Sequence, residues 1–284
     1  MKKQRVFIIG GPTASGKSSF AIQLAERCNG EIVNGDAIQV YQDLRILSAR
    51  PSIADEQKVP HHLFGYVDAW TTPAITDWLK NVAETVPSIQ NPIIVGGTGM
   101  YLDALINGIS PIPDVPDKIR QQVRKMPLND VQKQVKDCFF TDPQRMRRAL
   151  EVQLATGHSL VYFQKLQKIK YLDADFIELT LLPDREIVYR NCETRYQQMI
   201  KEGVIQEVAD LMNKNPTGGV LKAIGVQAIK QYLDKEIDEK EMANRVVTAT
   251  RQYAKRQMTW FRHHGHPQYI ITNPKNFDFN KITK

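Results

Sequence analysis

The most informative segment of this chain of 284 residues is Gly11-Pro12-Thr13-Ala14-Ser15-Gly16-Lys17-Ser18. It matches the pattern G-x-x-x-x-G-K-[ST], follows the apolar run Val6–Ile9, which predicts a buried strand, and precedes a helical pattern. Such glycines let backbone N–H groups converge on an anion at a helix N-terminus. Lys17 adds a positive charge for the distal phosphate, and Ser18 can ligate Mg²⁺. The motif therefore predicts a P-loop that holds an oligophosphate.

The P-loop alone does not distinguish ATP, GTP and a prenyl diphosphate. A kinase or NTPase would be supported by an apolar strand that ends in an aspartate serving the same Mg²⁺. The candidate for that strand is Glu31-Ile-Val-Asn34-Gly35-Asp36, where Asn34 and Gly35 interrupt the apolar run before the acid. Asp36 is therefore predicted to be a carboxylate of the site, and its role stays open at this point.

Short apolar runs separated by helical patterns predict the fold class. Most of the runs are continuous, as is typical of parallel strands buried on both faces. The predicted strands are Val6–Ile9, Glu31–Asn34, Ile93–Val95, Phe176–Leu182 and Tyr269–Ile271. We therefore expect an α/β fold, a P-loop NTPase-like parallel sheet flanked by helices.

Helix boundaries are marked at several places. Asp142-Pro143 predicts a helix start and Gly157 its end, and a second helix opens at Pro183-Asp184 and runs to about Lys201. A third begins after Asp238 and continues to Arg262. Its predicted apolar stripe consists of Ala243, Val247, Ala254, Met258 and Phe261. Its basic edge consists of Arg251, Lys255 and Arg262.

The segment 110–140 departs from the rest in composition. It opens with the proline-rich Pro111-Ile-Pro-Asp-Val-Pro116 and then turns polar and helical. We expect it to form a small, mainly helical inserted subdomain, with 1–109 and 141–284 together forming the P-loop core.

Charge and cysteine content indicate which class of partner the protein binds and in which cellular compartment it is found. The net charge is +7, and no Asp or Glu occurs from Met242 to Phe277, which favours a polyanionic partner. No apolar run approaches the roughly 20 residues that span a bilayer. Three cysteines without CxxC spacing indicate plain thiols in a reducing cytoplasm. The clusters at His61 and His263 have poor geometry for a metal site, because adjacent side chains point in different directions.

Ordered blocks along almost the whole chain resemble the family of bacterial tRNA dimethylallyltransferases (tRNA isopentenyltransferases). They are GPTASGKS at 11–18, DAIQVY at 36–41, PHHL at 60–63, GGTGMYL at 96–102, DPQRMRRALEV at 142–152, AIG at 223–225 and TRQYAKRQMTWFR at 250–262. The last block is the most discriminating, because a generic P-loop kinase has no reason to carry it. The related adenylate isopentenyltransferases share the front blocks but typically lack it.

The resemblance implies transfer of a dimethylallyl group from dimethylallyl diphosphate to N6 of the adenosine just 3′ of the anticodon in tRNA, with Mg²⁺ as cofactor. Asp36 would be the general base, because an exocyclic amine is a weak nucleophile until its proton has an acceptor. Thr98 would lie beside the reaction channel and Arg195 on the diphosphate, completing the catalytic set. The implied diphosphate-binding residues are Gly11, Pro12, Thr13, Ala14, Ser15, Gly16, Lys17, Ser18 and Arg185.

The same resemblance implies how tRNA is held by a chain that we expect to be a monomer. The base must leave its stack to reach such a pocket. The implied contacts are Asp36, Ala37, Ile38, Gln39, Thr98, Arg120, Gln144, Arg145, Met146, Arg147 and Arg148. Arg251 and Lys255 would add phosphate contacts and make binding salt-dependent. Tyr41 and Tyr101 either pack near the channel or fill the core.

The chain departs from the family pattern at three places, and other functions stay open. It has Asp36-Ala37 where Asp-Ser is usual, Gly225-Val226-Gln227 where Gly-Tyr and a basic residue are usual, and an insertion shorter by about one helix. The alternatives are prenyl transfer to free AMP, ADP or ATP, and a P-loop kinase or NTPase or a non-catalytic RNA-binding relative.

Overall fold

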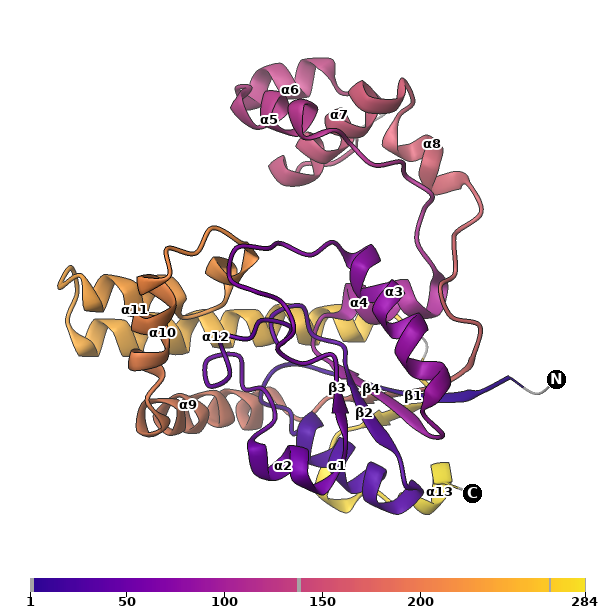
Figure 1. Cartoon of the computed structure of the whole chain (residues 1–284), viewed down its shortest axis with the longest axis vertical. Coiled ribbons are helices and arrows are strands. Elements are labelled where there is room, and N and C mark those ends of the chain that lie inside the picture. The colour runs from indigo at the N-terminus through magenta and orange to yellow at the C-terminus, as the bar shows by residue number, and fades with distance from the viewer. Residues whose placement is uncertain (1–2, 137–138, 266, 284) are drawn as a thin grey trace. The chain divides into compact units, whose positions relative to one another are not determined.

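The structure, a computed structural model, describes residues 3–136, 139–265 and 267–283. The chain divides into two compact units (Figure 1). Unit 1 comprises Met1–Ile106 and Leu172–Lys284, and unit 2 comprises Asn107–Tyr171. In the described residues, no helix is both long and apolar enough to cross a membrane.

Unit 1 is built on a parallel sheet of six strands in the order β3-β2-β4-β1-β5-β6. The strands are β1 (Arg5–Gly10), β2 (Glu31–Asn34), β3 (His61–His62), β4 (Pro92–Gly96), β5 (Asp175–Leu181) and β6 (Tyr269–Ile271). The five predicted strands are confirmed. The edge strand β3 was missed, because two histidines carry no apolar run.

The chain returns from β3 to place β4 between β1 and β2, and then crosses to β5 on the other side of β1. In open parallel sheets, ligands bind at the carboxyl ends of the strands near such a reversal. The loops that follow β1, β2 and β4 are therefore the expected position of a site.

Helices pack around the sheet of unit 1 (Figure 1). They are α1 (Lys17–Cys28), α2 (Ile53–Lys58), α3 (Ile75–Thr85), α4 (Gly99–Asn107), α9 (Arg185–Glu202), α10 (Val204–Asn213), α11 (Val226–Leu233), α12 (Glu239–His263) and α13 (Asn280–Thr283). Short 3₁₀ turns lie at Val86–Ser88, Gly219–Lys222 and Pro274–Asn276. One apolar core joins α1 to the sheet, and a second joins the segment 40–47 to α10, α11 and α12.

The long helix α12 has the predicted span, but its buried face was only partly predicted. Ala254, Met258 and Phe261 are buried as expected. Toward the N-terminal end, Met242 and Val246 are buried, whereas Ala243 and Val247 are half-exposed. The reason is a change of neighbours: the first half packs with α11 in one core, and the second half packs with Val188 and Cys192 of α9.

Unit 2 is helical, with α5 (Asp117–Lys125), α6 (Leu128–Gln134), α7 (Pro143–Thr156) and α8 (Leu160–Lys165). Helix α7 begins and ends as predicted, with the Asp142 carboxylate accepting from Arg145 N at 2.8 Å and Gly157 left-handed at φ 76°.

Unit 2 is longer than the predicted segment 110–140. Met146 and Leu150 of α7 pack with Val123 and Val131 of α5 and α6 in one small core. The segment 141–171 therefore belongs to the inserted unit and not to the P-loop core, because α7 supplies half of the buried side chains that hold the unit together.

Candidate active site

The P-loop joins β1 to α1. Gly11 has φ 147°, and a Cβ on it would lie 2.5 Å from the Leu181 carbonyl oxygen, so a side chain is excluded there. Gly16 is left-handed at φ 89° and turns the chain into the first residue of α1. Lys17 Nζ donates to the Pro12 carbonyl at 2.7 Å, across the mouth of the loop. Backbone N–H groups at the start of α1 favour an anion at this position.

A second loop, after β2, carries Asp36. Asn34 is fully buried, and its side chain binds both the N–H of Asp36 (2.9 Å) and the carbonyl of Asp36 (3.0 Å). Trp78 Nε1 donates to the Asn34 carbonyl at 2.7 Å. The Asp36 carboxylate in turn accepts from Ile38 N through Oδ1 at 2.9 Å. The carboxylate is therefore oriented by its own loop.

A third loop, Gly96–Gly99, follows β4 and approaches both neighbours closely. A Cβ on Gly96 would lie 2.0 Å from the Gly35 carbonyl oxygen, and a Cβ on Gly99 would lie 2.2 Å from the Trp260 ring. Thr98 Oγ1 accepts from Ala37 N at 3.1 Å, which links this loop to the Asp36 loop. Glycines are required here because the backbone itself fills the space.

Two helices from the C-terminal half close the site. Arg195 of α9 donates from Nη1 to Thr13 Oγ1 at 2.8 Å, and Asn191 donates to the Ala14 carbonyl at 2.9 Å. From α12, Gln257 accepts from Thr13 N at 2.8 Å and donates to the Gly97 carbonyl at 2.7 Å. Tyr253 of the same helix lies beside Thr98 and Gln257, and both act to lower the pKa of its hydroxyl.

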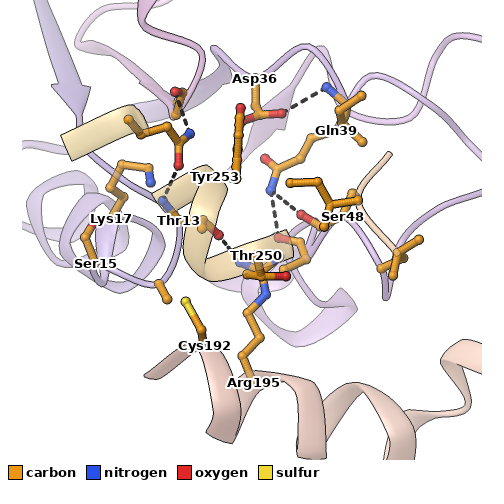
Figure 2. A pocket seen from close by; sticks show the side chains of 18 of the residues that line it. Thr13, Ser15, Lys17, Asp36, Gln39, Ser48, Cys192, Arg195, Thr250 and Tyr253 are labelled. Carbon is orange, nitrogen blue, oxygen red and sulfur yellow. Dashed lines mark hydrogen bonds between the residues drawn. The ribbon is translucent and has the colours of Figure 1, made fainter. Parts of the chain in front are cut away.

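These elements enclose a cavity of about 600 Å³ within unit 1 (Figure 2). The predicted site residues that line it are Thr13, Ala14, Ser15, Gly16, Lys17, Ser18, Asp36, Ala37, Ile38, Gln39, Thr98 and Arg195. Figure 2 shows Lys17, Asp36 and Arg195 approaching it from three different elements. The structure thus brings together the predicted general base, the P-loop and the arginine.

Burial shapes the electrostatics of this cavity. Desolvation lowers the pKa of Lys17 to about 8, an effect that Asp36 opposes and Arg195 reinforces. Burial also lowers the pKa of Arg195, while Cys192 and Asp36 act in the opposite direction. The pKa of Tyr253 is raised, by burial first and by the negative charge of Asp36 second.

Two buried polar atoms at the P-loop end have no hydrogen-bond partner in the described chain: Ser15 Oγ and Arg195 Nε. Unsatisfied buried donors are costly unless a ligand completes them. With the positive charges of Lys17 and Arg195, they make this end of the cavity suited to an anion with several oxygens.

Other predicted residues lie outside the cavity lining. Arg185 is exposed, with its guanidinium 4.9 Å from the Tyr189 ring. Arg251 forms an ion pair with Glu193, and Lys255 is exposed on α12. The remainder belong to unit 2 or to the buried start of the P-loop: Gly11, Pro12, Arg120, Gln144, Arg145, Met146, Arg147 and Arg148.

The predicted tRNA-binding residues of unit 2 differ in their exposure and in their contacts. Gln144 and Arg145 are exposed, whereas Met146 is buried in the core of the unit, which removes its side chain from any surface contact. Arg147 donates to the Val123 carbonyl, and Arg120 donates to the Val115 carbonyl at 3.1 Å. These two arginines hold turns of their own unit together.

Sequence reasoning missed three residues of the site: Asn34, Tyr253 and Gln257. Asn34 had been seen only as an interruption of a strand. Tyr253 and Gln257 carry no sequence signal beyond their place in the block 250–262. Gln257 is only 6% exposed, but the helical projection treats the buried face as a purely apolar stripe and therefore does not identify a buried polar side chain.

Three histidines of the predicted clusters have structural partners. His62 Nε2 lies 2.6 Å from Glu31 Oε2, His61 Nδ1 lies 2.8 Å from the Val59 carbonyl, and His264 stacks on Trp260. Across the described residues, no group of three metal-ligating side chains of His, Cys, Asp or Glu occurs. Cys192 is buried and Cys28 half-buried, both without a disulfide, whereas Cys138 and His266 lie outside the described residues. Tyr41 and Tyr101 are both buried in the core.

A parallel sheet with a P-loop at its central strand, opening into a cavity that holds a carboxylate, defines an enzyme of the P-loop class that acts on a phosphorylated substrate. Comparison with known proteins specifies it further. A family model described as IPP transferase matches residues 39–264, and one described as isopentenyl transferase matches residues 4–64. The chain belongs to the IPP transferase family.

Relatives with curated names extend over the full chain. A tRNA dimethylallyltransferase of Zymomonas mobilis subsp. mobilis is 41% identical over 301 residues, covering 99% of this chain and 95% of its own. Another of Rhizobium etli is 41% identical, covering 91% of this chain and 94% of its own. A third, of Rickettsia bellii, is 35% identical over 100% of this chain and 96% of its own.

Solved structures agree with the fold. A full-length tRNA isopentenylpyrophosphate transferase of Bacillus halodurans aligns with a TM-score of 0.71 at 26% identity, covering 99% of this chain and 93% of its own. A eukaryotic dimethylallyltransferase described as acting on tRNA aligns with a TM-score of 0.77 at 28% identity, covering 91% of this chain and 70% of its own.

Proposed function

We propose that this chain transfers a dimethylallyl group from dimethylallyl diphosphate to N6 of an adenosine in tRNA, the one 3′ of the anticodon, and releases diphosphate. The observation that carries the proposal is a single cavity with unsatisfied donors and two cations at its P-loop end and an oriented carboxylate, Asp36, among its other lining residues. The family membership and the curated relatives support the same reaction.

In this reaction the amine nitrogen forms a bond with the allylic carbon, the bond between that carbon and the diphosphate oxygen breaks, and the amine loses a proton. Asp36 accepts that proton or a hydrogen bond from it. Lys17 and Arg195 stabilise the charge that gathers on the leaving diphosphate. Ser15 Oγ and Arg195 Nε, which have no hydrogen-bond partner among the described residues, would be further donors to its oxygens.

The residues present are compatible with Mg²⁺, because this ion needs few ligands from the protein. Mg²⁺ is usually held by one or two protein oxygens together with substrate phosphates and waters. Ser18 lies exposed in the cavity lining at the first turn of α1, and its hydroxyl would be the protein ligand. When bound, the ion neutralises part of the charge on the diphosphate.

Charge supports an RNA acceptor. Unit 2 contains twelve Lys and Arg but six Asp and Glu, so most of the net charge of +7 belongs to these 65 residues. Lys and Arg that neutralise phosphates release counterions and provide most of the affinity for nucleic acid. We propose that the chain acts as a monomer in the cytoplasm.

The test is incubation of the protein with Mg²⁺, labelled dimethylallyl diphosphate and either tRNA that lacks the modification or AMP. We expect label in tRNA, and mass spectrometry of the anticodon-loop nucleosides to show one prenylated adenosine per molecule. Label in AMP but not in tRNA would assign the chain to adenylate prenylation. Hydrolysis of ATP without any prenyl transfer would assign it to the kinases and NTPases.

A further inference from the structure

Gln257 connects two loops that belong to different parts of the site. Its side chain is buried on α12, accepts from the Thr13 N–H of the P-loop at 2.8 Å, and donates to the Gly97 carbonyl of the loop after β4 at 2.7 Å. One planar amide therefore uses its acceptor on one loop and its donor on the other. A neutral amide offers this combination at every pH, whereas a carboxyl offers it only when it is protonated.

The connection continues to the loop that carries Asp36. Tyr253, one turn before Gln257 on α12, lies beside Gln257 and Thr98, and both act to lower the pKa of its hydroxyl. Thr98 Oγ1 accepts from Ala37 N at 3.1 Å, next to Asp36. Thr13 has a second partner, because Arg195 donates to its hydroxyl at 2.8 Å. Because Gly97 is bonded directly to Thr98, these contacts connect the P-loop through Gln257 to the backbone next to Asp36.

Gly97 leaves no space for a side chain between its backbone and the Gln257 amide. A Cβ on Gly97 would lie 2.4 Å from Gln257 Nε2, and 3.4 Å from Asp36 Oδ2. A contact of 2.4 Å displaces one of the two groups, so any larger residue at position 97 would break the hydrogen bond. The glycine and the glutamine therefore form a matched pair, and the pair lies beside the carboxylate.

We infer that Gln257 is a positioning residue that fixes the donor-binding P-loop against the loops that present Asp36 to the acceptor. This inference rests on the proposed function. The Thr13 N–H donates to Gln257 and therefore does not bind a phosphate. This hydrogen bond instead fixes the position of the P-loop. A displacement of about 1 Å between reacting groups costs roughly 100-fold in rate. Loss of the connection is therefore expected in kcat, with donor binding retained.

Gln257→Glu tests the donor half of the amide. The glutamate keeps an acceptor for Thr13 N–H but turns an oxygen toward the Gly97 carbonyl, and the two repel each other. At pH 8 we expect kcat to fall about tenfold or more, with KM for dimethylallyl diphosphate within about threefold of the wild type.

Acidification provides a readout that a purely structural role would not move. A carboxyl at position 257 is protonated at lower pH and then donates to Gly97 as the amide does, and burial favours that neutral form. The ratio of variant to wild-type kcat is expected to rise several-fold from pH 8 to pH 6. The charged and titratable groups lining the same cavity are Lys17, Asp36, Cys192, Arg195, Tyr196, Lys222, Tyr253 and Arg256.

Gly97→Ala breaks the same bond from the other side and leaves Gln257 in place. It is expected to show the same fall in kcat but no recovery at pH 6, because no new titrating group is introduced. Gln252→Glu is the control, since Gln252 is an exposed glutamine of the same helix and makes the same change of charge. It is expected to keep kcat within twofold at both pH values.

The outcomes separate the two proposals. If the wild type transfers no prenyl group to tRNA, the proposed function fails. If the wild type is active and both Gln257→Glu and Gly97→Ala keep kcat within twofold, the positioning role is overturned. It is also overturned if the loss lies wholly in the KM for the donor, or if the variant to wild-type ratio of Gln257→Glu is the same at pH 6 and pH 8.

Discussion

Asp36 owes its orientation to its own loop. Asn34 bonds the backbone on both sides of Asp36, and Ile38 N–H binds one carboxylate oxygen. Such local side-chain contacts are characteristic of Asn and Asp in turns. An oriented carboxylate can take a proton from a weakly nucleophilic amine without first reorganising.

Asp36→Asn isolates that proton transfer. The amide keeps an oxygen for Ile38 N–H and nearly the same volume, so the loop should keep its shape, but the group no longer accepts a proton. We expect kcat for prenyl transfer to fall by about 10² to 10⁴, while the Kd values for tRNA and for dimethylallyl diphosphate stay within about threefold. Rapid-quench measurement of a single turnover checks this. Wild-type kcat in the variant would remove the assignment of Asp36 as the base.

From the pKa of Lys17 we can predict how the affinity for dimethylallyl diphosphate depends on pH. Burial lowers its pKa to about 8 in the free protein, and only the protonated form attracts the diphosphate. The Kd for dimethylallyl diphosphate should therefore be nearly constant below pH 7 and weaken above pH 8, approaching about tenfold per pH unit. Calorimetric titration from pH 6.5 to 9.5 measures it. Lys17→Arg, which stays charged, should bind without this dependence, and the same slope in both proteins would contradict the prediction.

At the scale of elements, the sequence predicted what depends on short-range pattern. Continuous apolar runs identified β1, β2, β4, β5 and β6, and cap residues located α7, α9 and α12. The face of α12 was only partly predicted, because a projection assumes one partner along the helix and α12 has two. The bonds of Gln257 join residues more than 150 positions apart, and no local pattern contains them.

The N-cap of α7 gives a prediction for one element. The Asp142 side chain accepts from Arg145 N at 2.8 Å, and Pro143 occupies the first helical position. Asp142→Ala removes the cap and should lower the stability of the unit by about 1 kcal/mol. Hydrogen exchange of α7 amides should speed up about fivefold, while β1 and β4 in unit 1 remain unchanged. Thr141→Ala, at the exposed preceding position, is the control, and equal exchange in the two variants would exclude a role for the cap.

At the scale of the whole molecule, the cavity and the excess of positive charge belong to different units. All residues lining the cavity belong to unit 1, and the excess of basic residues belongs to unit 2. Composition alone indicated an insertion but placed its end at 140, because the apolar residues of α7 that complete its core lie in a stretch that reads as an ordinary amphipathic helix. The division predicts that donor binding and tRNA affinity can be changed independently.

Replacing residues 107–171 by a flexible linker of about ten Gly and Ser residues tests that division. Such a protein keeps every residue that lines the cavity, so the Kd for dimethylallyl diphosphate should stay within about threefold. The Kd for tRNA should rise at least tenfold near 0.15 M salt, since lost phosphate contacts carry much of the affinity.

A full-length variant with Arg145→Gln, Lys165→Gln and Lys168→Gln, all exposed positions, removes charge without removing the fold. It should weaken tRNA binding and reduce the slope of log Kd against log salt by roughly one to three. Unchanged tRNA affinity in both proteins would locate the RNA contacts in unit 1, with the basic edge of α12 as the next surface to test.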